Sequence, residues 1–533
     1  MKKYIFPTIV VVSLCLGFVG GNMLSEKAHA QSLNWGGLRF HLGKVDQTIS
    51  YIEQAYVDEV DIDSVTDEVM IDLIKQLDPH SAYIPKKDLE IVNSELDASF
   101  SGIGVQFSIQ NDTVSIVAVV SGGPSEGIGI LAGDKIVEVD DSVFCGKGIN
   151  NERVMRTLRG EKGTKVKLTI RRSGESEPLY FTVTRGDIPV HSIDASFMAT
   201  KNIGFIRVSK FSETTYDEFI SALARLRSEG ADSYIIDLRE NSGGYMDKAI
   251  RMANEFLSSG DMIVYAEGRA YNRYEARSNG IGRFKNVPLV VLIDEFSASA
   301  SEIFAGAMQD NDRATIIGRR SFGKGLVQQQ MPLIDGSAVR LTVARYYTPS
   351  GRCIQKPYEM GKGEDYMKDI IDRYDHGEFF SADSIHMTDT TTYLTKKGRV
   401  VHGGGGIMPD IFIGRDTSLN TPWYNRVVNR AYTYQFAYQY TDRHRKELNK
   451  IRDWQDMEKW LKKQNWIPEF VQFCKDKGVE PNDKEIEKSK PLLLRIVNAY
   501  IVRNTLGDDA FFQLYERDDE VTREAIQQLS QKK

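Results

Sequence analysis

The spacing of hydrophobic and polar residues changes several times along the chain, and each pattern predicts a different kind of structure. Residues 38–96 repeat apolar positions at helical spacing, as in "VDQTISYIEQAYV" and "DEVMIDLIKQL". From Phe100 the pattern becomes one of short strands and glycine turns, interrupted by the helical stretch "NERVMRTLRG". Between about residues 188 and 352, strand-like and helix-like segments alternate, which predicts an α/β core. From about Thr417 the pattern is helical again.

These changes predict a multidomain α/β protein with five segments. They are a signal peptide or membrane anchor at residues 1–30, a helical N-terminal domain at 31–97, a strand-rich domain at 98–187, an α/β core at 188–415 and a helical C-terminal domain at 416–533. Within the core, residues 356–400 are polar and charged, and we expect them to form an insertion.

The N-terminus has the features of a bacterial export signal. Lys2 and Lys3 precede an apolar stretch, and Ala28-His29-Ala30 supplies an A-x-A cleavage pattern. The stretch of about 20 residues is also long enough to remain as a membrane anchor. We therefore expect an exported protein of the periplasm or cell envelope, with anchoring to the inner membrane as the alternative to cleavage.

Composition and charge narrow the classes of function. With 41% hydrophobic and 27% charged residues, the 533-residue chain is expected to be globular, and its net charge of −6 gives no footprint for nucleic acid. Cleavage would leave Cys145, Cys353 and Cys474, an odd and widely spaced set that argues against a disulfide framework. No CxxC, HExxH or other metal-ligand spacing occurs, so we expect neither a metal nor another cofactor.

Two neighbouring segments carry candidate chemistry. In "PLVVLIDEFSASASEIFAGAMQD" a buried strand leads to a turn with three serines and then a helix, and "RRSFGKGLVQ" places Lys324 between glycines, 25 residues after the middle serine, Ser299. A serine at a helix mouth can share a developing oxyanion with free N–H groups, and a desolvated lysine can act as a base. The structural alternative is that Ser299 and Glu302 form a capping box and that Lys324 is a surface residue. As a pair, the segments predict a Ser-Lys hydrolase.

Three other motifs match known functional patterns, but the residues around them do not supply the structural context that each pattern requires. Residues 318–325 nearly match a P-loop but lack the Ser/Thr that holds magnesium, and a strand pattern follows them. Residues 123–127 match the nucleophile elbow of α/β-hydrolases, so a lipase or esterase using Ser125 is an alternative, although the glycines that follow disfavour the required helix. Residues 127–132 imitate a dinucleotide fingerprint without room for a crossover helix.

An ordered set of strings resembles one known family, the carboxyl-terminal processing (tail-specific) serine proteases. The strings are "LDPHSAYI", "FSGIGV", "LRGEKGTKVKLTIRR", "IIDLRENSGG", "SASASEIFAGAMQDN", "SFGKGLVQ" and "ARYYTPSGR". They run from about residue 75 to 352, and "GGGGIMPDI" follows at 403–411. The resemblance implies a ClpP/crotonase-like protease core with an inserted PDZ domain at 98–187.

The resemblance also assigns the catalytic residues. It makes Ser299 the nucleophile, Lys324 its general base and Gln328 the residue that orients the lysine. If Lys324 and Gln328 lay on one straight strand, their Cα atoms would be about 13 Å apart, so a turn or long side chains must close that gap. The oxyanion donors would be backbone N–H groups: that of Ala300 and that of Gly243 or Gly244, between which the sequence does not choose.

The string "FSGIGV" would be the loop of the PDZ domain that holds a peptide carboxylate, through Gly102, Ile103 and Gly104. The structural alternative is a tight glycine turn. Two departures from the family pattern stand before the nucleophile: Asp294 replaces a usual asparagine, and Phe296 replaces a usual small residue.

The sequence therefore predicts an envelope endopeptidase that binds the C-termini of protein or peptide substrates and cleaves with a Ser-Lys dyad. The alternative is a catalytically silent PDZ scaffold for envelope proteins. Intact Ser299, Lys324 and Gln328 argue against a scaffold, which has no need to retain them. Membrane association through the N-terminus, self-association and an adaptor protein are left open.

Overall fold

A computed structural model describes residues 33–35, 38–40, 43–94, 99–110, 112–120, 122–131, 133–172, 175–386 and 391–531. The chain divides into two compact units, residues 1–74 and 75–533. The expected signal peptide or anchor at 1–30 lies outside the described residues. Within the described ranges, no helix has the length and apolar character needed to span a bilayer.

The first unit is helical, in agreement with the helical spacing of its sequence. A short antiparallel hairpin is followed by two helices. The bounds are β1 Leu33–Trp35, β2 Leu38–Phe40, α2 Lys44–Ala55 and α3 Ile62–Lys75, the last of which ends at the unit boundary.

The strand-rich segment folds around its own apolar core. Its main sheet has the order β10-β9-β7-β6-β5, with β8 paired to β7, and β4 pairs with β11 in a separate ladder. Val114, Ile116, Ile136 and Val166 are fully buried between the sheet and helix α5. The bounds are β4 Ser99–Gly102, β5 Val105–Gln110, β6 Thr113–Val119, η1 Glu126–Ile128, β7 Lys135–Val139, β8 Ser142–Val143, α5 Asn151–Leu158, β9 Lys165–Arg171, β10 Leu179–Thr184 and β11 Gly186–Pro189.

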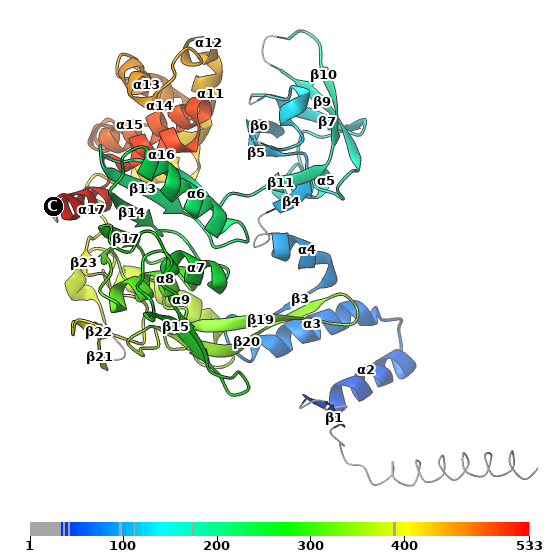
Figure 1. Cartoon of the computed structure of the whole chain (residues 1–533). Helices are drawn as coiled ribbons and strands as arrows, with labels where there is room; N and C mark the ends of the chain where they lie inside the picture. The colour runs from blue at the N-terminus through cyan, green and yellow to red at the C-terminus, as the bar shows by residue number, and fades with distance from the viewer. Residues whose placement is uncertain are drawn as a thin grey trace, which may run out of the picture. The chain divides into compact units, whose positions relative to one another are not determined.

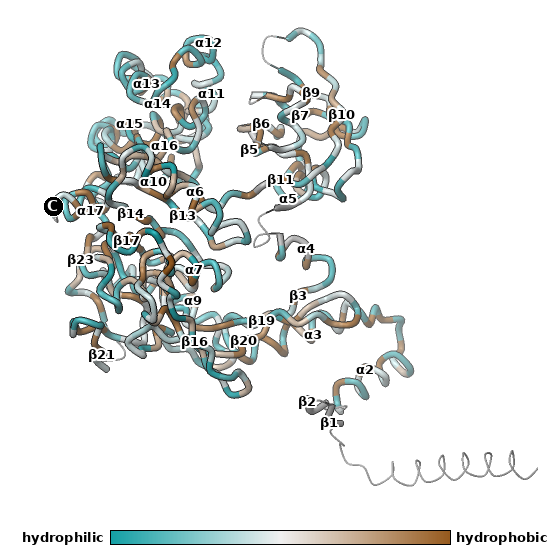
Figure 2. Tube along the Cα trace, in the orientation of Figure 1, coloured by the Kyte–Doolittle hydropathy of each residue, from teal (hydrophilic) through white to brown (hydrophobic). Residues whose placement is uncertain are grey.

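The core is a six-stranded sheet, β12-β13-β14-β17-β18-β23, in which all pairs but the β12–β13 pair are parallel (Figure 1). Every residue of β13, β14 and β17 is buried, as expected for parallel strands covered on both faces. The hydrophobic stretches of these strands lie inside the core in Figure 2. The bounds are β12 Ile193–Met198, β13 Ile203–Val208, β14 Ser233–Asp237, β17 Leu289–Ile293, β18 Thr315–Gly318 and β23 Ile411–Phe412.

Helices cover both faces of this sheet. On one face α6, α7 and α8 pack with Ile206, Ile236 and Val291, and on the other α17 packs with Phe205 and Val290. The C-terminal helix α17 is thus part of the α/β core, which the sequence pattern did not indicate. The bounds are α6 Thr215–Ser228, α7 Met246–Asn254, α8 Ala300–Asp310 and α17 Glu520–Gln531.

A second sheet, β16-β15-β20-β19, carries an added strand, β3, from the segment that follows α3. Pro79 and Pro85 flank β3, and proline disfavours a helix at both places, so the helical pattern ends in a strand here. The bounds are β3 Ala82–Ile84, α4 Lys86–Ser94, β15 Met262–Glu267, β16 Tyr274–Arg277, β19 Leu326–Pro332 and β20 Ala338–Tyr347.

The polar insertion and the C-terminal segment complete the fold. The insertion forms α9, η2 and the hairpin β21–β22, and the C-terminal helices enclose a core around Trp423 and Trp466. This mixed α/β fold with a helical C-terminal region confirms the expected fold class. The bounds are α9 Gly363–Asp375, η2 Ala382–Ser384, β21 Thr392–Leu394, β22 Val400–His402, α10 Pro422–Asn429, α11 Tyr432–Arg443, α12 Arg445–Leu448, α13 Trp454–Leu461, α14 Ile467–Asp476, α15 Asp483–Leu506 and α16 Asp508–Glu516.

Candidate active site

Ser299 lies in a strained turn between the buried strand β17 and the first turn of α8. Its backbone has φ 54° and ψ −113°, a conformation that costs a residue with a side chain about 1–3 kcal/mol. Asp294 organises the turn, because its Oδ1 accepts the N–H groups of Glu240 (2.9 Å) and Phe296 (3.1 Å). An asparagine oxygen could accept the same bonds, so this departure leaves the turn intact, and Phe296 is half-exposed.

Glu302, three residues into α8, joins the serine turn to the lysine segment. Its Oε2 accepts the N–H groups of Ser299 (2.8 Å) and Lys324 (2.9 Å), and its Oε1 accepts Gly323 N–H (2.7 Å) and Ser321 Oγ (2.5 Å). Full burial raises the pKa of Glu302 to about 7, against the effect of these four bonds. The predicted reach of Glu302 back to Ser299 is present, but the carboxylate does more than cap a helix.

Lys324 is partly buried, and its side chain lies within hydrogen-bond distance of Gln328. Its Nζ donates to Gln328 Oε1 at 3.1 Å. Burial lowers the pKa of Lys324 below its ordinary value, and the positive charge of Arg340 lowers it further, whereas Glu302 and Asp78 oppose both effects. Burial thus favours the neutral amine of Lys324 relative to that of a solvated lysine.

The local backbone explains how Lys324 and Gln328 meet. Lys324 precedes β19, which begins at Leu326, and the pairing of β19 with β20 shifts register between Val327 and Gln328. The straight-strand separation therefore does not apply. The hydroxyl of Tyr346 lies 3.0 Å from the Ser299 carbonyl and also donates toward the Lys324 carbonyl, which fixes both backbones.

The glycine loop after β14 packs directly against Ser299. Gly243 and Gly244 have φ values of 106° and 137°, and a Cβ at Gly243 would lie 2.7 Å from that of Ser299. Gly243 N–H already donates to Asn241 Oδ1 at 2.8 Å. Within the described ranges, the N–H groups of Gly244 and Ala300 have no hydrogen-bond acceptor. This difference separates the two glycines that the sequence left as alternatives.

A cavity of about 790 Å³ brings these groups together. Ser299, Lys324, Gln328, Gly243 and Gly244 all line it. Its other lining residues are mainly apolar or cationic, and none of them is an aspartate or glutamate: they include Ile303, Leu326, Met246, Lys210 and Arg340. Glu302, which accepts the Lys324 N–H group, is fully buried and does not line the cavity.

The "FSGIGV" loop has a separate and well-defined geometry. Gly104 has φ 77°, and a Cβ there would approach Pro124, Gly123 and Ile188 at 3.0–3.1 Å. The carbonyl of Ile103 accepts the Ser125 hydroxyl at 2.6 Å, and Ser125 is fully buried. A nucleophile must reach solvent-borne substrate, so the lipase or esterase interpretation based on Ser125 is wrong.

Several residues around the lysine were not found by sequence reasoning. Gln328 Nε2 donates to the carbonyl of His80, and the His80 ring lies against Tyr366 of the polar insertion. The only signal was that His80 belongs to the string "LDPHSAYI", which the resemblance includes without assigning it a role. Among the described residues, no group of His, Cys, Asp or Glu could hold a metal ion.

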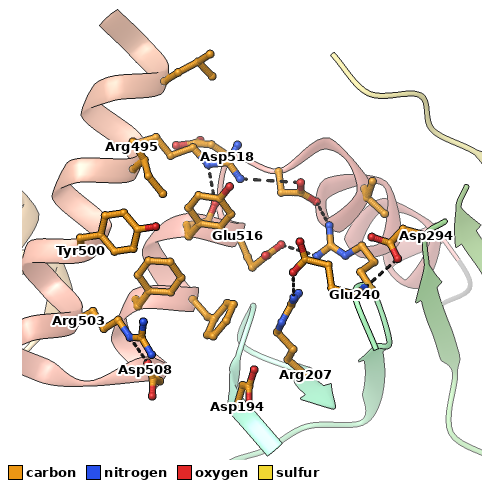
Figure 3. A pocket seen from close by; sticks show the side chains of 18 of the residues that line it. Asp194, Arg207, Glu240, Asp294, Arg495, Tyr500, Arg503, Asp508, Glu516 and Asp518 are labelled. Atoms are coloured by element: carbon orange, nitrogen blue, oxygen red, sulfur yellow. Dashed lines mark hydrogen bonds and ion pairs between the residues drawn. The ribbon is translucent and has the colours of Figure 1, made fainter. Parts of the chain in front are cut away.

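A larger cavity, of about 1250 Å³, is not the candidate site. It lies where the core meets the C-terminal helices, and none of its lining residues is a predicted catalytic residue. Figure 3 shows its charged side chains engaged with one another: Arg207 pairs with Glu240 at 2.7 Å and Arg503 with Asp508 at 2.5 Å.

Three family models match parts of the chain. Residues 202–365 match peptidase family S41, residues 101–183 match the PDZ domain, and residues 423–507 match a family of unknown function, DUF8443. A carboxy-terminal-processing protease of Bartonella bacilliformis is 35% identical over 350 residues, which cover 63% of this chain and 79% of the relative. Carboxy-terminal processing protease CtpA of Bacillus subtilis is 35% identical, and the match covers 66% of this chain and 73% of the relative.

Two solved structures are also similar to parts of this chain. The photosystem II D1 C-terminal processing protease is 23% identical with a TM-score of 0.36, covering 69% of this chain and 86% of that chain. The PDZ domain of a carboxy-terminal protease from Vibrio cholerae is 29% identical with a TM-score of 0.16, covering 17% of this chain and 99% of that chain. The two sequence relatives, which are matched over more than two thirds of their length, by themselves show the family. The chain belongs to the carboxy-terminal-processing serine proteases of peptidase family S41 and carries a PDZ domain.

Proposed function

We propose that this chain is an endopeptidase of the cell envelope that cleaves proteins with Ser299 as nucleophile and Lys324 as general base. The observation that carries the proposal is the shared cavity: Ser299 and the partly buried Lys324, whose pKa is lowered, line it together, and Glu302 accepts a hydrogen bond from the backbone of each. Gln328, whose oxygen accepts from Nζ, orients the base.

Bond cleavage follows from these positions. Neutral Lys324 takes the Ser299 proton while Oγ attacks the scissile carbonyl carbon, and the carbonyl π electrons move to the oxygen. The N–H groups of Gly244 and Ala300, which have no acceptor of their own in the described chain, receive that oxyanion. The ammonium of Lys324 then gives its proton to the leaving amine as the C–N bond breaks. Water then attacks the acyl carbon as Lys324 takes its proton, the bond from that carbon to Ser299 Oγ breaks, and the lysine returns the proton to Oγ, which releases the acyl group as a carboxylic acid.

Substrate capture is assigned to the PDZ domain. An extended C-terminal peptide would add beside β5, and the N–H groups of Ile103 and Gly104 would hold its carboxylate. The left-handed backbone at Gly104 and the tight space around it support a loop built for close approach. The export pattern at residues 1–30 supports an envelope location, which cell fractionation of the tagged chain would test.

An active-site label tests the catalytic assignment. A fluorophosphonate probe, followed by peptide mapping, is expected to modify Ser299 of the full chain and to leave Ser299→Ala unlabelled. Ser125→Ala serves as the matched control and should label like the wild type. A folded wild-type chain that takes no label would favour the PDZ scaffold, and a label on any other serine would contradict the assignment of Ser299.

A further inference from the structure

A tight turn ahead of β3 is fixed to the strand that faces the active site. The Asp78 carboxylate accepts the N–H groups of His80 (2.9 Å) and Ser81 (3.0 Å), and the Thr342 hydroxyl on β20 (3.0 Å). Ser81 Oγ in turn accepts Thr342 N–H at 3.0 Å. Burial raises the pKa of Asp78, but the Ser81 hydroxyl, which donates to Oδ2 at 2.5 Å, and the bonds from His80, Thr342 and the Ser81 N–H lower it overall, so the turn is anchored by a charged group. The backbone carbonyl of His80 therefore has a defined position.

That carbonyl selects the orientation of the Gln328 amide. A carbonyl oxygen can only accept a hydrogen bond, so the side of the amide that faces His80 must be the NH₂ group, as observed. The amide oxygen is then left facing Lys324 Nζ, at 3.1 Å. With the amide reversed, NH₂ would face the lysine and Gln328 could not accept from it.

The His80 ring contacts Tyr366 of the polar insertion. His80 Nε2 lies 3.0 Å from the hydroxyl of Tyr366, whose ring meets it edge-on at 4.9 Å, and Tyr366 is buried. Gln355 Nε2 donates to the same hydroxyl at 3.3 Å, which leaves the Tyr366 proton to be donated to His80. Gln355 Oε1 accepts Gly325 N–H at 2.8 Å, directly after Lys324.

The contacts close into a ring around the base. Starting at Lys324, it passes through Gln328, His80, Tyr366 and Gln355 and returns to the lysine segment at Gly325. We propose that His80 and Tyr366 are positioning residues, which hold the Gln328 amide with its oxygen toward Lys324. This role rests on the proposed function of Lys324 as the base. It places part of the catalytic machinery on a turn and an insertion that lie 286 residues apart.

Tyr366→Phe tests the proposal, because it removes only the hydroxyl that grips His80. Since the hydrogen bonds of this hydroxyl to His80 and from Gln355 are both lost, we expect kcat on dye-labelled casein to fall about tenfold while KM stays within about twofold. The matched control is Tyr358→Phe, whose ring packs on Tyr366 at 6.4 Å but makes no hydrogen bond to His80 or Gln355, and which should retain wild-type kcat. His80→Ala is the second variant and should lower kcat in the same way.

A double-mutant cycle separates positioning from a general structural role. If Tyr366 acts through Gln328, Tyr366→Phe should reduce kcat no further in a Gln328→Ala background. An equal fall in both backgrounds would overturn the proposal, as would wild-type kcat in both Tyr366→Phe and His80→Ala. If Tyr366→Phe does not fold, as judged by its melting curve, the cycle with His80→Ala decides. Failure of the proposed function would look different, because the wild-type chain itself would then not be labelled at Ser299.

Discussion

At the scale of a single residue, Glu302 connects the proposed nucleophile Ser299 to the proposed base Lys324. Its carboxylate accepts four hydrogen bonds, yet full burial raises its pKa to about 7. A carboxyl group with a higher pKa in the folded than in the unfolded chain stabilises the fold at low pH. That contribution is lost as the pH rises through the folded value. For Glu302 the window runs from the ordinary value of 4.5 to about 7.

Glu302→Gln should therefore change how stability depends on pH, because glutamine cannot ionise. From pH 4.5 to above 7 the wild-type chain should lose on the order of 3 kcal/mol of unfolding free energy relative to the variant. Urea titrations of both proteins at several pH values measure this difference. Curves that stay parallel across the window would show that Glu302 keeps an ordinary pKa.

Lys324→Arg should be as inactive as Lys324→Ala. Arginine keeps the positive charge but stays protonated at any working pH, so it cannot accept the serine proton. In the wild type, kcat/KM should rise with pH and level off below the ordinary lysine pKa of 10.5, because burial lowers the pKa of Lys324. The test is the pH profile of casein hydrolysis, and an active Lys324→Arg chain would make the lysine structural only.

Individual residues also show what the sequence could and could not predict. Ser299, Lys324 and Gln328 were predicted because local strings carry them. The choice between Gly243 and Gly244 depends on one hydrogen bond, which Gly243 N–H donates to Asn241 Oδ1. The string "IIDLRENSGG" contains both residues, but residue order does not give the backbone and side-chain torsion angles that decide which N–H group is satisfied.

At the scale of elements, we predict a substrate preference from the PDZ loop that contains Gly104. Hydrogen bonds to a charged group are worth about 1.5–3 kcal/mol, so a long substrate with a free apolar C-terminus should be cut about ten- to a hundredfold faster than its amidated form. Gly104→Val should abolish the difference, because a side chain there meets Pro124 and Gly123 and strains the left-handed backbone. The cleavage rates of the free and the amidated substrate, measured with the wild type and with Gly104→Val, give this difference.

The matched control for that loop is Gly127→Val in the same domain. A Cβ at Gly127 meets no atom within 4 Å, so the preference for a free carboxylate should persist. Labelling of Ser299 should be unchanged in both variants. Equal cleavage of free and amidated substrates by an active wild type would mean that this domain does not read C-termini.

For two elements, the sequence predicts a change of structure or an insertion but not the contacts that the element makes. The change of pattern at "LDPHSAYIP" indicated the end of the helical segment, yet β3 adds to the sheet that carries Gln328. The polar composition of residues 356–400 predicted an insertion, yet its helix α9 supplies the buried Tyr366. Composition indicates the average exposure of a segment. It does not show that one side chain of a polar helix, Tyr366, is buried, and the role that we propose for this helix depends on that side chain.

At the scale of the whole molecule, the C-terminal helices contact the chain just before the glycine loop at 241–244, in which we propose one of the oxyanion donors. Arg239, just before that loop, pairs with Asp237 (2.8 Å), Glu516 (2.7 Å) and Asp519 (2.9 Å). Buried arginine with several carboxylates is held firmly, and removing one partner leaves an uncompensated charge. Helix α17 begins directly after Asp519 and packs on the core sheet. Asp519 therefore connects this helix to Arg239, 280 residues earlier in the chain and just before the glycine loop.

Ala525→Asp should therefore damage both stability and the active site. Ala525 is fully buried against the core sheet, and an unpaired carboxylate there should cost several kcal/mol. Displacing α17 would release Arg239 from Asp519, and the fluorophosphonate labelling rate of Ser299 should fall with the melting temperature. Gln527→Asp adds the same charge to the exposed side of the same helix and should leave both unchanged. A less stable Ala525→Asp chain that labels at the wild-type rate would show that the helix stabilises the core without supporting the oxyanion loop.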